Sequence, residues 1–134
     1  MILVINTANE ETFLGLYDNK WLELIEWEAG RELSAQILIK LEEVYKRAGK
    51  EFNETTGVIV SKGPGSFTGL RIGLSIANAF AYSLKIPIVG LAKITDNEKL
   101  LKKGQEALRE KTTFDEPVTP EYGREPNISK PKKA

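Results

Sequence analysis

Hydrophobic and polar residues follow strand-like patterns over the first part of the chain. Ile2–Ile5 is continuously apolar, as expected of a strand covered on both faces. Thr12–Tyr17 and Trp21–Trp27 follow it, separated by a turn signal at Asp18-Asn19 that lacks the usual glycine. The three segments together predict an antiparallel meander.

The period then changes from two to about 3.6 residues. Arg31–Ala48 repeats apolar residues at helical spacing, and Gly49 is a suitable C-cap. Gly57–Ser61 predicts a short buried strand, and Pro87–Leu91 predicts another. A second helix, ending at about Leu84, crosses between these two strands, so we expect them to pair in parallel. The pattern predicts an α/β fold with a mixed five-stranded sheet and helices.

The composition changes after this last strand, and we divide the chain into residues 1–92 and 93–134. Thr95–Lys111 has a capping-box pattern, Thr95 with Glu98, followed by mostly charged residues. Its apolar stripe is narrow, so we expect the helix to pack weakly on the rest. The proline-containing stretch from Thr112 is expected to be an extended tail docked near Val118 and Tyr122.

Composition excludes several classes of function. The formal net charge is zero, which gives no overall attraction for nucleic acid or anionic membranes. The 134 residues include no cysteine and no histidine, so disulfides, a thiol nucleophile, a Ser-His pair and most zinc sites are excluded. No run reaches membrane-spanning length, and Met1–Ile5 is too short for a signal peptide. We expect a cytoplasmic protein without cofactor or metal.

The most informative segment is a glycine-rich turn followed by the second helix. It consists of Gly63, Pro64, Gly65, Ser66, Phe67, Thr68 and Gly69, and continues as Leu-Arg-Ile-Gly. Three interpretations compete. The glycines could expose backbone N–H groups to a phosphate, although the segment is neither a Walker loop nor G-x-G-x-x-G. They could serve a tight turn, with Ser66 or Thr68 capping the helix. The third concerns the helix itself.

Small residues recur every fourth position along that helix and form a smooth stripe that permits a close backbone approach. Its members are Gly69, Gly73, Ala77 and Ala81. With the flanking apolar residues, the stripe covers about 200° of the helical wheel at 100° per residue. An ordinary surface helix needs an apolar arc of roughly 100° or somewhat more. Either intramolecular packing or a partner protein must cover the excess.

The segment from Gly63 to Gly73 resembles the signature of the TsaB (YeaZ) family, Gly-Pro-Gly-Ser-Phe-Thr-Gly followed by Arg-Ile-Gly. Ile2–Thr7 and Arg31–Ala48 are similar to the first strand and first helix of that family, so the resemblance spans residues 1 to about 92. It implies one RNase H-like lobe of the actin/Hsp70/sugar-kinase type. Residues 93–134 then correspond to a remnant of a second lobe that is mostly missing.

The resemblance also implies a function. Members of the family are non-catalytic subunits that bind the TsaD-type catalytic subunit and support threonylcarbamoyl transfer to the tRNA adenosine beside the anticodon. A TsaE-type ATPase joins the pair, homodimers form through the same helices, and tRNA is contacted only indirectly. The partner interface expected here consists of Ile37, Leu41, Tyr45, Arg71, Gly73, Leu74, Ser75, Ala77, Asn78, Ala81 and Tyr82.

One departure from the family pattern bears on chemistry. The first strand of the family usually ends in Asp-Thr, but this chain has Asn6-Thr7. An acid there supports a metal ion in related ATP-using folds, so Asn6 argues against nucleotide chemistry. Two alternatives remain open at this point: a nucleotide-binding or peptidase-like enzyme fragment, and a purely structural homodimer.

Overall fold

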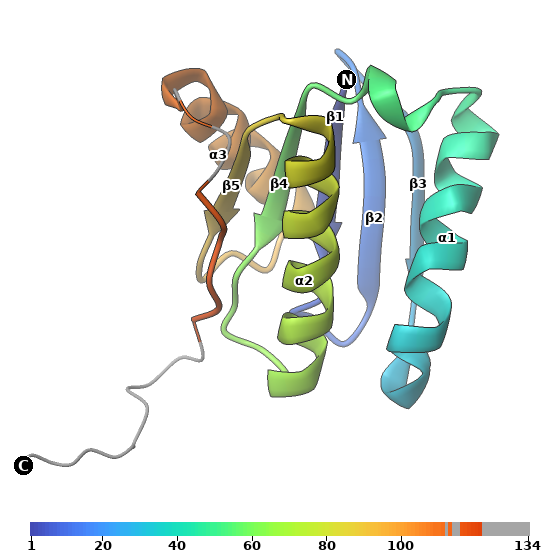
Figure 1. Ribbon diagram of the computed structural model, residues 1–134. Coiled ribbons are helices and arrows are strands. Elements are labelled where there is room, and N and C mark those ends of the chain that lie inside the picture. The colour runs from blue at the N-terminus through green and yellow to red at the C-terminus, as the bar shows by residue number, and fades with distance from the viewer. Residues whose placement is uncertain (112, 114–115, 122–134) are drawn as a thin grey trace, which may run out of the picture.

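The computed structural model describes residues 1–111, 113 and 116–121 (Figure 1). Five strands and three α-helices make up the ordered core of this part of the chain. The strands are β1 (Ile2–Asn6), β2 (Thr12–Tyr17), β3 (Trp21–Trp27), β4 (Gly57–Ser61) and β5 (Ile88–Leu91). The helices are α1 (Leu33–Ala48), α2 (Phe67–Leu84) and α3 (Asn97–Glu110). Short 3-10 helices occupy Gly30–Glu32 and Phe52–Glu54.

The strands form one mixed sheet in the order β3-β2-β1-β4-β5. The first three strands pair antiparallel, as the meander prediction required. Strand β4 pairs in parallel with both β1 and β5, and Val58 is the register partner of Ile88. The predicted α/β fold, with its mixed five-stranded sheet, is therefore confirmed.

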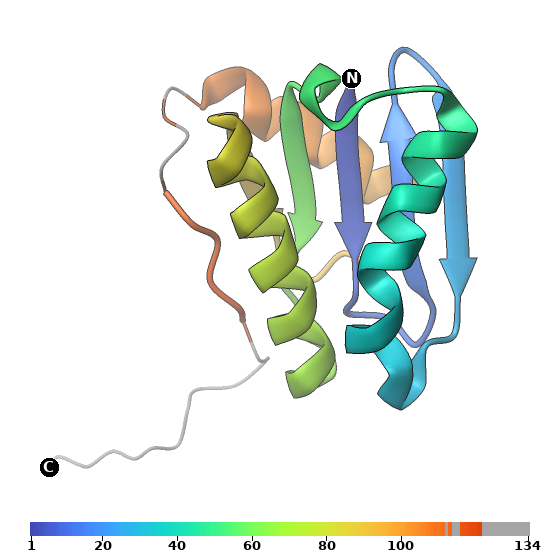
Figure 2. The ribbon, with the colours of Figure 1, turned by 45° about the vertical axis from the view of Figure 1, so that its right-hand side comes forward.

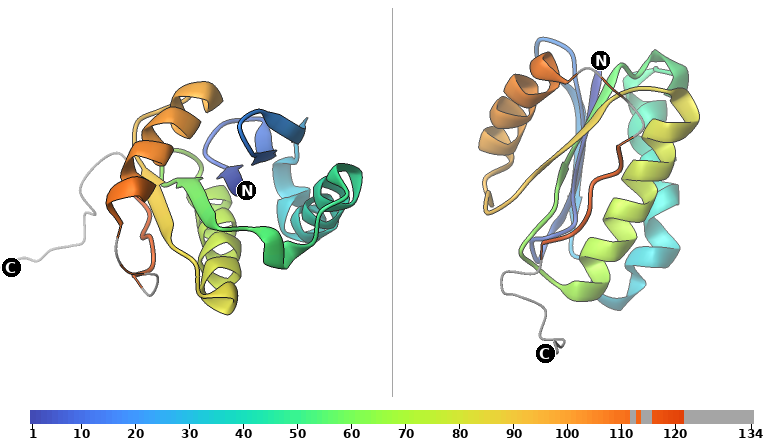
Figure 3. Two further views of the ribbon diagram at one scale, coloured as in Figure 1. Left: turned by 90° about the horizontal axis from the view of Figure 1, so that it is seen from above. Right: turned by 60° about the vertical axis from the view of Figure 1, so that its left-hand side comes forward.

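Helices cover both faces of this sheet (Figure 3). Helices α1 and α2 lie side by side on one face, and α3 lies on the other (Figures 2 and 3). Alternation along β1 divides the core accordingly: Leu3 and Ile5 belong to the cluster beneath α1 and α2, whereas Val4 belongs to the cluster beneath α3. The continuous apolar run at the start of the chain thus reflects a central strand buried on both sides.

The expectation that the third helix packs weakly is wrong. Leu100 and Leu101 of α3 are buried, and Gly104 lies directly against the side chain of Ile59 in β4. Because Gly104 has no Cβ, α3 can lie close to the sheet, and Leu100 and Leu101 fill the space between the helix and the sheet. The N-cap is also Asp96 rather than Thr95, since the Asp96 carboxylate accepts hydrogen bonds from the amides of Glu98 and Lys99.

Residues 116–121, here called the strap, run beside α2 and β5 (Figure 3). The Asn78 side chain of α2 donates to the Val118 carbonyl at 2.9 Å and accepts from the Val118 amide at 2.8 Å. The Glu121 amide donates to the carbonyl of Lys62 at 2.7 Å. Docking near Val118 is therefore confirmed, while Tyr122 lies outside the described residues. The strap closes the β5 side of α2.

Candidate functional site

The glycine-rich turn connects β4 to α2, as expected. Ser66 is the N-cap of α2, and its hydroxyl accepts a hydrogen bond from the Gly69 amide at 3.1 Å. Gly63 has a φ of 107°, a value that L side chains rarely adopt. The turn interpretation of the glycines is confirmed by this geometry, with Ser66 rather than Thr68 as the cap.

The small residues of α2 allow the helix to approach the end of β1. A Cβ on Gly73 would collide with the Thr7 side chain, and the Thr7 hydroxyl donates to the Gly69 carbonyl at 2.8 Å. Ala77 and Ala81 are fully buried over the same sheet. The close approach inferred from the stripe is therefore made by a strand of the same chain.

The structure divides the expected interface residues into two groups. Arg71, Ser75 and Tyr82 are exposed on α2, with Tyr82 at 69% exposure. The others are buried in the core, apart from half-buried Asn78, whose amide is bonded to the strap. The buried ones are Ile37, Leu41, Tyr45, Gly73, Leu74, Ala77 and Ala81. These residues pack inside this chain, so most of the wide apolar arc of α2 is covered by intramolecular packing.

Sequence analysis missed the apolar residues that remain exposed on the outer side of the two helices. Leu38 and Ile39 of α1 are 55% and 64% exposed, and Phe67 at the start of α2 is 55% exposed. The Arg71 guanidinium lies 5.2 Å from the centre of the Phe67 ring. A signal was available in the sequence: Leu38 and Ile39 follow Ile37 directly, and three consecutive apolar residues cannot all lie on one face of a helix. We define the helix face by Leu38, Ile39, Phe67, Arg71 and Tyr82.

Asn6 at the end of β1 is buried and has its hydrogen-bonding groups in use. Its side-chain amide donates to Asn97 Oδ1 at 2.8 Å, and its Oδ1 accepts from the Ala8 amide at 2.9 Å. Within the described part of the chain, no group of three acidic residues is placed to hold a metal ion. This corner of the sheet is built as an amide-to-amide contact between β1 and α3.

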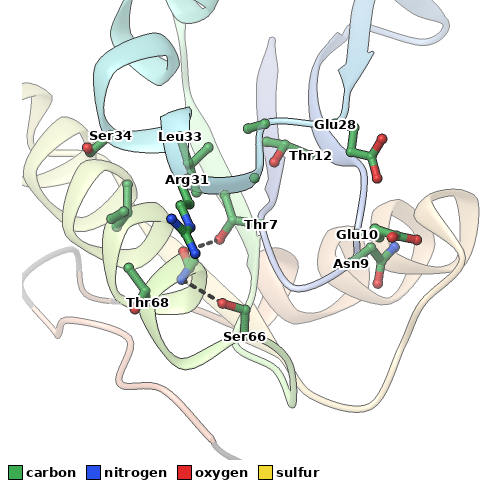
Figure 4. Close-up of a pocket in the computed structure, with 14 residues that line it drawn as sticks. Thr7, Asn9, Glu10, Thr12, Glu28, Arg31, Leu33, Ser34, Ser66 and Thr68 are labelled. Carbon is green, nitrogen blue, oxygen red and sulfur yellow. Dashed lines mark hydrogen bonds between the residues drawn. The ribbon is translucent and has the colours of Figure 1, made fainter.

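A cavity of about 630 Å³ lies beside the turn, at the end of the sheet where α1 and α2 begin (Figure 4). Its walls come from the β1–β2 turn, the connection from β3 to α1 and the start of α2. The polar residues lining it are Thr7, Asn9, Glu10, Thr12, Glu28, Arg31, Ser34, Ser66 and Thr68. Such a position, outside the carboxyl ends of parallel strands, is where α/β sheets commonly bind ligands.

Within the described part of the chain, no helix is both long enough and apolar enough to cross a bilayer.

Comparison with known proteins gives a consistent set of relatives. A family model for TsaD, tRNA N6-adenosine threonylcarbamoyltransferase, matches residues 27–108. The tRNA threonylcarbamoyladenosine biosynthesis protein TsaB of Buchnera aphidicola subsp. Acyrthosiphon pisum is 32% identical over 94 residues, which is 70% of this chain and 42% of that protein. TsaB of Escherichia coli is 29% identical over 93 residues, or 69% of this chain and 40% of that protein.

A solved structure shows the same fold. YeaZ from Pseudomonas aeruginosa superposes with a TM-score of 0.67 at 20% identity, covering 78% of this chain and 49% of that one. With the family model, this likeness confirms the RNase H-like lobe expected from the sequence. The chain spans less than half the length of the TsaB relatives that it matches.

Proposed function

Because this chain belongs to the TsaB (YeaZ) family, we propose that it serves the biosynthesis of threonylcarbamoyladenosine in tRNA as a non-catalytic subunit that binds a TsaD-type protein. The TsaB relatives are named for this biosynthesis, and the TsaD family model matches most of the chain. The proposed docking surface is the helix face.

The distribution of exposed apolar side chains carries the docking proposal. Of the six large hydrophobic residues exposed in the described part of the chain, four lie on α1 or α2: Leu38, Ile39, Phe67 and Tyr82. Complete burial of such a side chain contributes about 1.5–3 kcal/mol. Four of them give enough driving force to offset a substantial part of the entropic cost of association. Arg71 adds a cation of the kind enriched at interfaces.

A non-catalytic role is supported because the chain lacks, or uses structurally, the side chains that catalysis commonly needs. The sequence has no histidine or cysteine. The Ser66 hydroxyl acts as a helix cap, and Asn6 uses its side-chain amide within the fold. The alternative, a nucleotide-binding or peptidase-like fragment, would be favoured by measurable affinity of the isolated chain for ATP with magnesium in calorimetric titration.

A homodimer would bury the same helix face. Adding a TsaD-type protein distinguishes the two hypotheses: if the proposed complex forms, sedimentation should show that a heterodimer replaces the homodimer. A homodimer that persists in the presence of the TsaD-type protein would favour the purely structural alternative. Binding of a TsaE-type ATPase to the pair, and indirect contact with tRNA, remain further parts of the proposal.

The docking proposal predicts that acidic substitutions on the helix face weaken the complex. Leu38→Glu and Tyr82→Glu place a charge where the partner would bury an apolar group, so binding to the TsaD-type protein of the same organism should weaken by at least about 2 kcal/mol for each. Both side chains are exposed, so the isolated chain should stay folded. Co-expression followed by size-exclusion chromatography measures complex formation, and circular dichroism checks the fold.

Leu24→Glu is the matched control. Leu24 is 38% exposed and lies on β3 next to Ile25, whose side chain faces α1 and α2, so Leu24 faces the opposite side of the sheet. This control should leave the complex intact. Unchanged co-elution of both helix-face variants, or equal loss with Leu24→Glu, would rule out docking through α1 and α2.

A further inference from the structure

The cavity beside the glycine-rich turn lies at the N-terminal ends of two long helices. Leu33 and Ser34 of α1 and Thr68 and Gly69 of α2 line it, and both helices start at the same end of the sheet (Figures 1 and 4). A helix N-terminus carries a partial charge of about +0.5. Ser66 caps α2, but no side chain caps the start of α1. Two positive helix ends therefore converge on one cavity.

A buried hydroxyl without a partner points to a ligand in this cavity. Thr12 is 3% exposed and lines the cavity (Figure 4). Phe13 packs beneath α3, so Thr12 faces the α1 and α2 side, where the cavity lies. Among the described residues, none forms a hydrogen bond with the Thr12 hydroxyl. A buried hydroxyl left unsatisfied costs about 1–3 kcal/mol, which a bound polar group would recover.

The charges around the cavity are divided between its two sides. Arg31 lines it, and no described carboxylate lies within ion-pair distance of this guanidinium. Glu10 and Glu28 also line the cavity, and Figure 4 shows them on the side away from Arg31, Ser66 and Thr68. The two helix ends and Arg31 together carry about as much positive charge as the two carboxylates carry negative charge.

We propose that this cavity binds a small zwitterion, a free amino acid or dipeptide. The ligand's carboxylate would lie at the helix N-termini and Arg31, its ammonium group would face Glu10 and Glu28, and Thr12 would bond to its polar atoms. A purely anionic ligand is disfavoured because the two carboxylates repel it, and a purely cationic ligand is disfavoured by the helix ends. A cavity of about 630 Å³ has room for a ligand of this size.

The test is a titration of the isolated, isotopically labelled chain with the dipeptide Gly-Ser, followed by nuclear magnetic resonance. Saturable shifts are expected at the amides of Ser34, Thr68 and Gly69. N-acetyl-Gly-Ser lacks the ammonium group and Gly-Ser amide lacks the carboxylate, so each should bind at least about tenfold more weakly. Inorganic phosphate is the anion-only probe. No partner protein is present, so the result does not depend on the docking proposal.

Variants locate the binding. Arg31→Gln and Glu28→Gln should each weaken Gly-Ser binding several-fold, whereas Arg109→Gln, an exposed arginine on α3, should not. Thr12→Val removes the hydroxyl with little change of shape, so binding should weaken while thermal stability is kept or improved. A marked loss of stability in Thr12→Val would show that the hydroxyl has a structural role and would contradict the proposal.

Three results would overturn the zwitterion site. The first is the absence of saturable shifts at the cavity. The second is binding that is insensitive to both Arg31→Gln and Glu28→Gln. The third is phosphate or the acetylated peptide binding as well as Gly-Ser, which would make the cavity an anion site only.

Discussion

Individual residues on α1 and α2 act mainly within the fold. Tyr45 is an example: it lies in the core, its ring packs against Phe52 and Phe80, and its hydroxyl lies 2.6 Å from the hydroxyl of Thr55. Burial raises the pKa of Tyr45 to about 12, although the hydrogen bond with Thr55 opposes the shift. Tyr45, which the sequence placed in the expected partner interface, therefore contributes to the stability of the fold.

The shifted pKa predicts a specific dependence of stability on pH. The folded state holds the phenol proton more tightly than the unfolded chain, whose pKa is about 10, so the contribution is complete below pH 10 and is lost as the pH rises to about 12. Two pKa units correspond to about 2–3 kcal/mol. The wild type should therefore lose more stability over this range than its advantage of about 1 kcal/mol over Tyr45→Phe at neutral pH, so the two free energies of urea unfolding should become equal and then cross. The variant should be less stable by about 1 kcal/mol at neutral pH, because Thr55 loses its partner.

The comparison isolates Tyr45, because the wild type and Tyr45→Phe differ at position 45 alone. If the stability difference between the wild type and Tyr45→Phe stays constant from pH 9 to 12, Tyr45 does not titrate with the shifted pKa.

At the scale of elements, α2 has three sides with different neighbours. Its small residues lie on the sheet, its outer side bears exposed Arg71 and Tyr82, and its β5 side is bonded to the strap through Asn78. Val118 of the strap also packs against Gly90 of β5, and any side chain at position 90 would collide with Val118. Arg71 and Tyr82 lie within about 40° of Asn78 around the helix axis, so the proposed docking surface on α2 runs directly beside the strap.

Asn78 is expected to be a main anchor of the strap, beside the hydrogen bond from Glu121 to Lys62 and the packing of Val118 on Gly90. Asn78→Ala removes both hydrogen bonds to the Val118 backbone, so the free energy of unfolding should fall by about 1–2 kcal/mol. Hydrogen exchange at the Val118 amide should become much faster. Ser75→Ala, an exposed position on the same helix, is the control and should change neither quantity. Unaltered exchange at Val118 in Asn78→Ala would mean that other contacts hold the strap.

At the scale of the whole molecule, the two layers of helices pack on opposite faces of the same sheet. Each layer is bonded to one of the two tryptophans: Trp21 donates to Glu98 of α3 at 2.7 Å, and Trp27 donates to Gln36 of α1 at 2.8 Å. Because Leu100 and Leu101 of α3 are as deeply buried as the residues under α1 and α2, we expect the described part of the chain to unfold as one unit. The boundary drawn at residue 92 would then not be a boundary between independent domains.

Single-tryptophan variants test this cooperativity. Trp27→Phe leaves Trp21 as the fluorescent residue and reports on the α3 side, while Trp21→Phe reports on the α1 side. Within each variant, fluorescence and far-ultraviolet circular dichroism should give the same urea midpoint and the same slope. A fluorescence midpoint on the α3 side that precedes the circular dichroism midpoint would show that residues 93–111 unfold separately.

The sequence by itself determined the order and types of the main elements, the parallel pairing of the strands at 57–61 and 87–91, and a cap on the second helix at Ser66 or Thr68. These depend on local periodicity and on turn chemistry, which neighbouring residues specify. Tertiary structure alone decided what covers each buried face. The helical wheel showed that Ala77 and Ala81 must be covered, but only the position of β1 relative to α2 shows that the chain covers them itself.

For the same reason, neither the helix face nor the cavity could be predicted from the sequence. Asn78 looked like an exposed polar residue until Val118, 40 positions away, supplied its partner. The cavity combines three connections that are distant in the sequence, and no local pattern places Thr12, Arg31 and Thr68 around one space. Burial of one face of a helix or strand produces a periodic pattern of apolar residues, which can be read from the sequence. Contacts between distant segments produce no such pattern, so only the folded structure identifies them.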